Sequence, residues 1–71
     1  MYKFTFLINP ISGGGQGKIV HSFVPEIMTS MGFKPEEWKS ELTEGSRLRE
    51  QIRDAAADTK TLIAVGGDGT V

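Results

Sequence analysis

The sequence predicts an α/β fold in which three parallel strands, in the order second, first, third, lie between helices in three layers. Residues 2–8 and 61–65 are short and mostly apolar, which is typical of buried strands. Between them, one amphipathic helix-like segment lies on each side of a more polar strand-like segment. Strands that alternate with helices pair in parallel through right-handed crossovers. The chain is therefore expected to run strand, helix, strand, helix, strand.

The first strand is expected over Tyr2–Ile8, in the middle of the sheet. Aromatic and polar residues alternate in its first half, and its second half, ending in Leu7 and Ile8, is apolar on both faces. Pro10 then ends the strand, because proline cannot donate a ladder hydrogen bond. The glycine-rich run over residues 12–17 is expected to be an irregular loop that leads into a helix.

The first helix is expected over residues 18–31, and Gly32 is expected to stop it. Apolar residues recur there every three or four positions, as on one helix face, at Ile19, Val20, Phe23, Val24, Ile27, Met28 and Met31. Pro25 interrupts the backbone hydrogen bonding, and the continuous phase of the pattern favours a kink over a break. The predicted core includes Phe4, Phe6, Phe23 and Ile27. His21 lies off the apolar stripe and is expected at the surface.

The polar segment Glu37–Thr43 is expected to be the edge strand, because apolar and charged residues alternate along it, with Trp38 on the apolar side. The second helix is expected over residues 45–57, with an apolar face made of Leu48, Ile52, Ala55 and Ala56. A solvated face with local ion pairs is predicted for Arg47, Arg49, Glu50, Arg53 and Asp54. A turn at residues 58–59 then leads into the third strand, Thr61–Val65.

Composition limits both the size of the core and the kinds of partner. The chain has 71 residues, 38% of them hydrophobic, and no cysteine, so it builds one small core without disulfides and its exposed edges make self-association plausible. Its net charge is −1 with alternating signs, which argues against nucleic-acid binding. It shows neither a signal peptide nor an apolar run near the roughly 20 residues that span a bilayer. The absence of cysteine fits a cytoplasmic setting.

Two glycine-rich loops follow the two apolar strands, and both are expected at one edge of the sheet. In parallel sheets, ligands bind beyond the carboxyl ends of the strands, near the point where the strand order reverses. Glycine allows the backbone to approach a charged ligand and to turn several N–H groups toward one anion. The arrangement therefore predicts a polyphosphate site formed by the two loops together.

Two common phosphate-binding motifs are excluded by their spacing. The P-loop pattern requires glycine at the position of Ser12 and serine or threonine at the position of Ile19. The dinucleotide pattern, started at Gly13, meets Lys18 where its last glycine belongs. Neither a P-loop ATPase nor a Rossmann NAD site is predicted.

The motifs that are present are Asn-Pro-x-Ser-Gly-Gly at residues 9–14 and Gly-Gly-Asp-Gly-Thr at residues 66–70. Together with a junction over residues 43–46 between strand and helix, they resemble the catalytic domain of the diacylglycerol kinase and sphingosine kinase superfamily. The second motif alone is shared with NAD kinases, and a close variant occurs in phosphofructokinases. The first motif is what favours lipid kinases. The chain departs from many relatives at Ser46 and Arg47, where those have an acidic residue and alanine.

The resemblance implies a site for ATP and Mg²⁺. It assigns nucleotide contacts to Asn9, Pro10, Ser12, Gly13, Gly14, Thr43, Gly66, Gly67, Asp68, Gly69 and Thr70. Asp68 is implied as the catalytic residue, the carboxylate that ATP and Mg²⁺ require. Two alternatives stay open at this point: Asn9 could only tie the loops together, and Asp68 could lie exposed in an ordinary turn. Lys18 is expected to be solvated, with contact to a phosphate as the alternative.

The implied activity is transfer of the γ-phosphoryl group of ATP to a lipid hydroxyl. We expect residues 1–71 to be the amino-terminal part of the catalytic domain, with the lipid-binding second domain beyond Val71, and to be inactive alone. The resemblance also implies a cytoplasmic protein that can contact the inner membrane surface peripherally. The alternatives are part of an NAD kinase, or a non-catalytic nucleotide-binding or structural segment.

Overall fold

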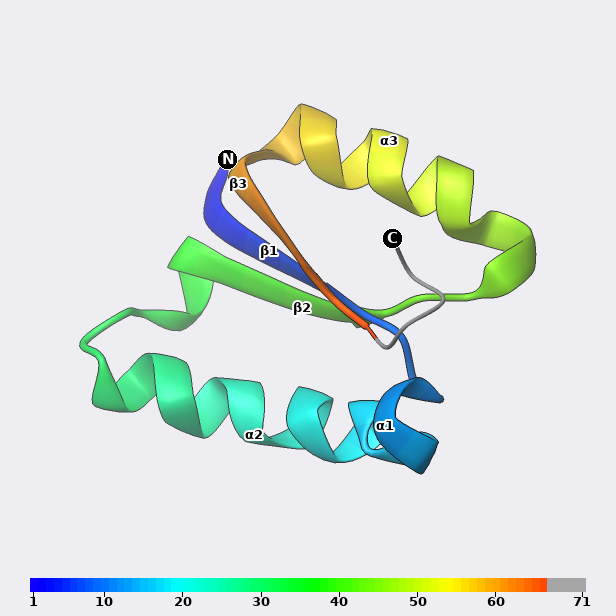
Figure 1. Cartoon of the computed structure of the whole chain (residues 1–71). Helices are drawn as coiled ribbons and strands as arrows, with labels where there is room; N and C mark the ends of the chain where they lie inside the picture. Colours follow the sequence, from blue (N-terminus) through cyan, green and yellow to red (C-terminus); the bar gives the residue numbers. More distant parts are fainter. Residues whose placement is uncertain (67–71) are drawn as a thin grey trace.

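A computed structural model describes residues 1–66, apart from the side chains at positions 12 and 13. Three parallel strands form one sheet in the order β2-β1-β3. Helix α2 covers one face of this sheet and α3 covers the other, which confirms the predicted three-layer fold (Figure 1). The elements run in the order β1 Tyr2–Ile8, α1 Ser12–Gly15, α2 Gly17–Ser30, η1 Pro35–Glu37, β2 Trp38–Leu42, η2 Gly45–Arg47, α3 Leu48–Asp58 and β3 Thr59–Val65.

Strand β1 lies in the centre of the sheet, as its apolar second half predicts. It pairs with β2 on one side and β3 on the other, so that Ile8 lies opposite both Leu42 and Val65. Leu7 is 4% exposed and Ile8 is fully buried. The last residues of all three strands therefore end level with one another, and their carboxyl ends share one edge.

The core is small and is divided between the two faces of β1. On the α2 face, Val24 and Met28 pack against Ile8, with six partly buried side chains around them: Phe4, Phe6, Phe33, Trp38, Leu42 and Val65. On the α3 face, the hydroxyls of Thr5 and Thr59 form a buried hydrogen bond of 2.7 Å. The predicted placement of Trp38 on the apolar side of its strand is confirmed.

Helix α2 begins and ends close to the predicted positions. It continues through Pro25 without a break. At its end, the N–H of Gly32 donates to the carbonyl of Thr29 and the N–H of Phe33 to that of Met28, the paired bonds of a Schellman motif. The stop expected at Gly32 is therefore confirmed.

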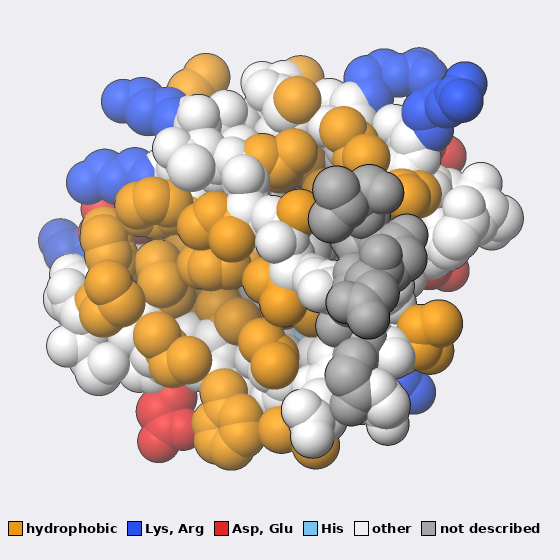
Figure 2. Space-filling view, viewed as in Figure 1, with side chains coloured by type: hydrophobic (Ala, Val, Ile, Leu, Met, Phe, Trp, Pro, Cys, Tyr) orange, Lys and Arg blue, Asp and Glu red, His pale blue; other side chains and the backbone are white. Residues whose placement is uncertain are grey.

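The structure differs from the prediction in how deeply α2 is buried, both at the apolar residues Phe23 and Ile27 and at His21. Phe23 and Ile27 were assigned to the core, yet each has about half of its side chain exposed, 50% and 51%. The apolar stripe of α2 is wider than a sheet of three strands can cover, so only the strip around Val24 and Met28 is buried. Figure 2 shows apolar side chains exposed in the region between α2 and α3, where β3 forms the edge of the sheet. His21, predicted at the surface, is half-buried, and its Nδ1 lies 2.6 Å from the hydroxyl of Ser40 on β2.

The remaining differences concern element boundaries. Residues 12–15 form a short helical turn, α1, and not the fully irregular loop that was predicted. The turn expected at residues 58–59 is absent, because α3 leads directly into β3 and buried Thr59 is held by the hydroxyl of Thr5. In the described part of the chain, no helix is both long enough and apolar enough to cross a membrane.

An ion pair joins the start of β1 to the entry of β2. The carboxylate of Glu37 contacts Lys3 Nζ at 2.7 Å and accepts a hydrogen bond from the backbone N–H of Lys34 at 2.9 Å. The bond from Lys3, and next that from Lys34, hold the pKa of Glu37 below its ordinary value of 4.5. Because the folded-state pKa is lowered, this stabilisation is complete above the unfolded-state value and is lost as the pH falls through the folded-state value.

We therefore expect the Lys3→Met variant to lose less stability on acidification below pH 4.5 than the unmodified chain. The measurement is the urea midpoint of unfolding between neutral and acidic pH. Lys39→Met removes a charge from an exposed position of β2 and is the control. Identical pH profiles for Lys3→Met and the unmodified chain would contradict the assigned pairing.

Candidate functional site at the carboxyl edge of the sheet

The carboxyl ends of the three strands bring separate segments of the chain together. Immediately after β1, the N–H of Asn9 donates to the carbonyl of Val65 at 2.9 Å. Immediately after β2, the N–H of Thr43 donates to the carbonyl of Ile8 at 2.8 Å. Gly66 follows β3 directly. The first loop, the β2 junction and the start of the second glycine motif thus share one edge, whereas the predicted site residues Gly67, Asp68, Gly69 and Thr70 lie outside the described residues.

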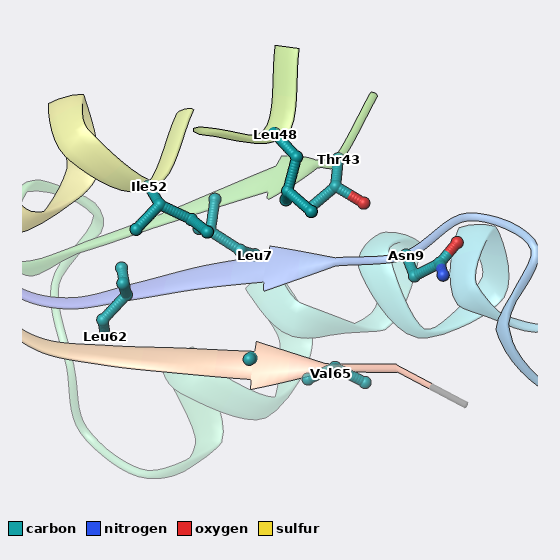
Figure 3. Close-up of a pocket in the computed structure, with 8 residues that line it drawn as sticks. Leu7, Asn9, Thr43, Leu48, Ile52, Leu62 and Val65 are labelled. Atoms are coloured by element: carbon teal, nitrogen blue, oxygen red, sulfur yellow. The ribbon is translucent and has the colours of Figure 1, made fainter. Parts of the chain in front are cut away.

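A hollow of about 240 Å³ lies between α3 and the sheet at this edge. Figure 3 shows Asn9 and Thr43 at its outer end, beyond the arrowheads of β1 and β2. The other lining residues are apolar: Leu7, Leu48, Ile52, Leu62, Ala64 and Val65. Ligand pockets usually have volumes of roughly 300–1,000 Å³, so this hollow fits part of a ligand the size of a nucleotide and not the whole.

Asn9 orders the loop that follows it. Its side-chain oxygen accepts a hydrogen bond from the N–H of Ile11 at 3.1 Å, which closes an Asx turn. Its backbone N–H binds β3, so Asn9 also joins the first loop to the strand that leads into the second. The bond to Ile11 stays within the first loop, whereas the backbone bond to Val65 reaches the strand that leads into the second loop. The amide nitrogen remains as the group that Asn9 can offer to a ligand.

The first loop is a compact structure built on glycine. Gly14 and Gly15 have φ angles of 72° and 99°, a region that side chains with a Cβ rarely adopt. Gly17 is buried where α2 starts against the end of β1, and a Cβ there would lie 1.9 Å from the carbonyl oxygen of Asn9. The sequence showed these glycines as a run, but only the structure distinguishes the positions set by φ from the one set by close approach.

The amino terminus of α2 meets the same loop. The residue before the helix, Gln16, makes no side-chain capping hydrogen bond among the described residues. The first backbone N–H groups of a helix lack partners within it, and the helix dipole adds positive potential there. These N–H groups lie at the end of β1, since Gly17 packs on Asn9. A helix amino terminus beside such an edge is a position at which anions commonly bind in proteins.

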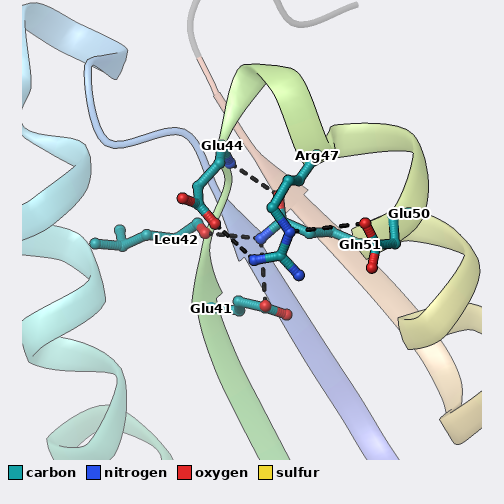
Figure 4. A network of polar contacts seen from close by, with 6 residues as sticks. All are labelled: Glu41, Leu42, Glu44, Arg47, Glu50 and Gln51. Carbon is teal, nitrogen blue, oxygen red and sulfur yellow. Dashed lines mark hydrogen bonds and ion pairs between the residues drawn. The ribbon is translucent and has the colours of Figure 1, made fainter.

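The β2 junction is held by Gln51 of α3, a residue that sequence reasoning missed. Figure 4 shows its side chain reaching from α3 toward Leu42 and Glu44. Gln51 is 3% exposed and hydrogen bonds to the chain immediately before and after Thr43. The sequence did contain one signal for Gln51, which is a polar residue on the apolar face of its helix. The spacing of residues could not show which groups it would bind.

Two cationic side chains near this edge, Arg47 and Lys18, differ in their surroundings. Arg47 contacts Glu44 at 2.8 Å and Glu50 at 3.7 Å, and the hydrogen bond to Glu44 is the main cause that raises the pKa of Arg47. This confirms the predicted local ion pair with Glu50 and gives Arg47 a structural role. Lys18, in the first turn of α2, is exposed, as expected.

The described residues gather Asn9, Pro10, Thr43 and Gly66 at one edge, with Gly14 in the adjoining helical turn. For Ser12 and Gly13 only the backbone is described, and it belongs to α1. Within residues 1–66, no group of three His, Cys, Asp or Glu side chains could hold a metal ion. The candidate metal ligand, Asp68, lies beyond that range.

The fold and this edge define a parallel α/β protein of the class that binds ligands beyond the carboxyl ends of its strands. The family model of the diacylglycerol kinase catalytic domain matches residues 3–71, and the chain belongs to that family. Membership implies a lipid kinase that uses ATP. Comparison with curated proteins and with solved structures gave no match.

Proposed function

We propose that this chain forms the amino-terminal, nucleotide-binding part of a lipid kinase catalytic domain. The reaction is transfer of the γ-phosphoryl group of ATP to a lipid hydroxyl, with diacylglycerol or a related glycerolipid as the acceptor. The observation that carries the proposal is the meeting of Asn9, Thr43 and the start of the second glycine motif at one edge, in a member of this family.

In this proposal the edge binds the phosphates of ATP. Loop N–H groups and the first turn of α2 supply hydrogen-bond donors and positive potential. Asn9 and Thr43 supply neutral polar side chains at the mouth of the hollow. Phosphoryl transfer depends mainly on positioning and on neutralising charge, and a rigid edge of backbone donors suits that task.

The second glycine motif, Gly66–Thr70, completes the proposed site. Asp68 is its carboxylate, the ligand type that a hard cation such as Mg²⁺ prefers. When bound, Mg²⁺ neutralises phosphate charge. The lipid acceptor is proposed to bind a second domain beyond Val71. We also propose a cytoplasmic protein that contacts the inner membrane surface peripherally to reach its substrate.

The experiment is a phosphorylation assay with the longer protein that this proposal implies. Purified protein is incubated with radiolabelled ATP, Mg²⁺ and either diacylglycerol in mixed micelles or NAD. Label in the lipid is the expected result. Label in NAD would instead identify an NAD kinase, and label in neither, from a folded protein that binds ATP, would contradict the proposed transfer.

A further inference from the structure

The carboxamide of Gln51 holds the chain on both sides of Thr43. Its Oε1 accepts from the N–H of Glu44 at 2.8 Å, and its Nε2 donates to the carbonyl of Leu42 at 3.0 Å. The same nitrogen donates to the carboxylate of Glu41 at 3.2 Å. Three bonds thus connect one buried α3 side chain to the end of β2 and the junction after it (Figure 4).

These partners require a side chain that both accepts and donates. The N–H of Glu44 needs an acceptor, whereas the carbonyl of Leu42 and the carboxylate of Glu41 need a donor. Glutamine meets both needs. An ionised glutamate of the same shape would accept from Glu44 but would place a negative charge against two acceptors. The geometry therefore selects a carboxamide at this position.

Thr43 is held in place from two sides, by the sheet and by Gln51. On the sheet side, the N–H of Thr43 donates to Ile8. On the α3 side, the residues before and after it are fixed by Gln51. Thr43 lines the hollow beside Asn9, so its position relative to the edge depends on both attachments.

We infer that Gln51 is a positioning residue for nucleoside triphosphate binding, which acts by fixing Thr43 at the carboxyl edge. Gln51 need not touch the nucleotide. A buried side chain that serves only to stabilise the fold would change overall stability, whereas a positioning residue changes the order of Thr43 and the affinity for nucleotide at temperatures where the chain is fully folded. The effect on nucleotide affinity rests on the proposed function, whereas the effect on the position of Thr43 does not.

The first test follows amide hydrogen exchange without nucleotide. In Gln51→Glu, which keeps the size of the side chain, the amides of Thr43 and Glu44 should exchange about tenfold faster or more, since their local structure is loosened. The amide of Asn9, bound to β3, should change little. Unchanged exchange at Thr43 and Glu44 would overturn the inference, whatever the nucleotide result.

The second test measures Mg-ATP affinity by titration well below the unfolding temperature. Gln51→Glu should weaken binding about tenfold, which corresponds to roughly 1.4 kcal/mol. Glu41→Gln added to it should restore part of the affinity, because a donor again faces the carboxylate at position 51. The matched control is Thr59→Val, which removes buried hydrogen bonds at the opposite end of β3 and should leave affinity unchanged.

The outcomes of these tests distinguish a failure of the positioning role of Gln51 from a failure of the proposed nucleotide-binding function. Equal losses of affinity in Gln51→Glu and Thr59→Val would assign the effect to stability and overturn the positioning role. Faster exchange at Thr43 with unchanged affinity would overturn it as well. If the unmodified chain does not bind Mg-ATP, the proposed function fails, and the exchange result alone decides whether Gln51 positions Thr43.

Discussion

Gly17→Ala is expected to disrupt the junction between β1 and α2 and to abolish nucleotide binding. The added Cβ would lie 1.9 Å from the carbonyl oxygen of Asn9 and 2.9 Å from Cα of Pro10, so backbone must move on one side or the other. Overpacking of this kind costs up to about 3 kcal/mol. A chain of this size rarely has more than roughly 3–5 kcal/mol of stability to lose. We therefore expect the free energy of unfolding to fall to roughly 0–2 kcal/mol, so that the chain is only marginally folded.

The measurement is urea unfolding followed by circular dichroism, with Gly45→Ala as the matched control. Gly45 has open space where a Cβ would be built, and its backbone is not in the left-handed region. Its substitution should change stability by no more than about 0.5 kcal/mol. If Gly17→Ala were as stable as Gly45→Ala, the close packing of α2 on Asn9 would be wrong, and the proposed arrangement of α2 donors at the edge would be wrong with it.

Asp68→Ala is expected to abolish lipid phosphorylation in the longer protein while leaving the fold intact. Asp68 is the carboxylate of the second glycine motif, which begins where β3 ends at the candidate site. Loss of one group that stabilises developing charge commonly lowers the rate by about 10²–10³, and loss of a cation with it lowers the rate further. We expect a decrease on the order of 10³ or more in the rate of lipid labelling.

Two further variants make the Asp68 result specific. Asp68→Asn keeps the shape of the side chain but removes the charge and replaces one acceptor oxygen with an NH₂ donor, and it should be as inactive as Asp68→Ala if the charge recruits Mg²⁺. Asp54→Ala removes an exposed carboxylate from α3 and should retain full activity. Lipid phosphorylation that persists in Asp68→Ala would remove this residue from its proposed role.

The features predicted well from sequence are those that depend on local pattern. The apolar second half of β1 predicted a central strand, and the alternation of strands and helices predicted parallel pairing in the order β2-β1-β3. That order places Asn9, Thr43 and Gly66 at one edge without any knowledge of side-chain packing. The sequence is therefore enough to predict where the candidate site lies, but not how its side chains are arranged.

The features that were missed depend on contacts between distant residues. Periodicity marks Phe23 and Ile27 as apolar positions of α2, but it does not say how wide a sheet covers that helix. The role of Gln51 depends on where α3 places it against the β2 junction, 7 to 10 residues away in sequence. Similarly, a run of glycines does not reveal that Gly17 is packed against backbone whereas Gly14 and Gly15 have open space where a Cβ would be.

The most direct test of the central claim is an NMR titration of the 71-residue chain with Mg-ATP. The claim is that the loops at the carboxyl edge together bind nucleotide phosphates. We predict the largest amide shifts at that edge, in Asn9, the first turn of α2, Thr43 and Gly66, with little change at Lys3 and Thr59 at the opposite edge. No shifts at millimolar Mg-ATP, or shifts confined to the opposite edge, would contradict it.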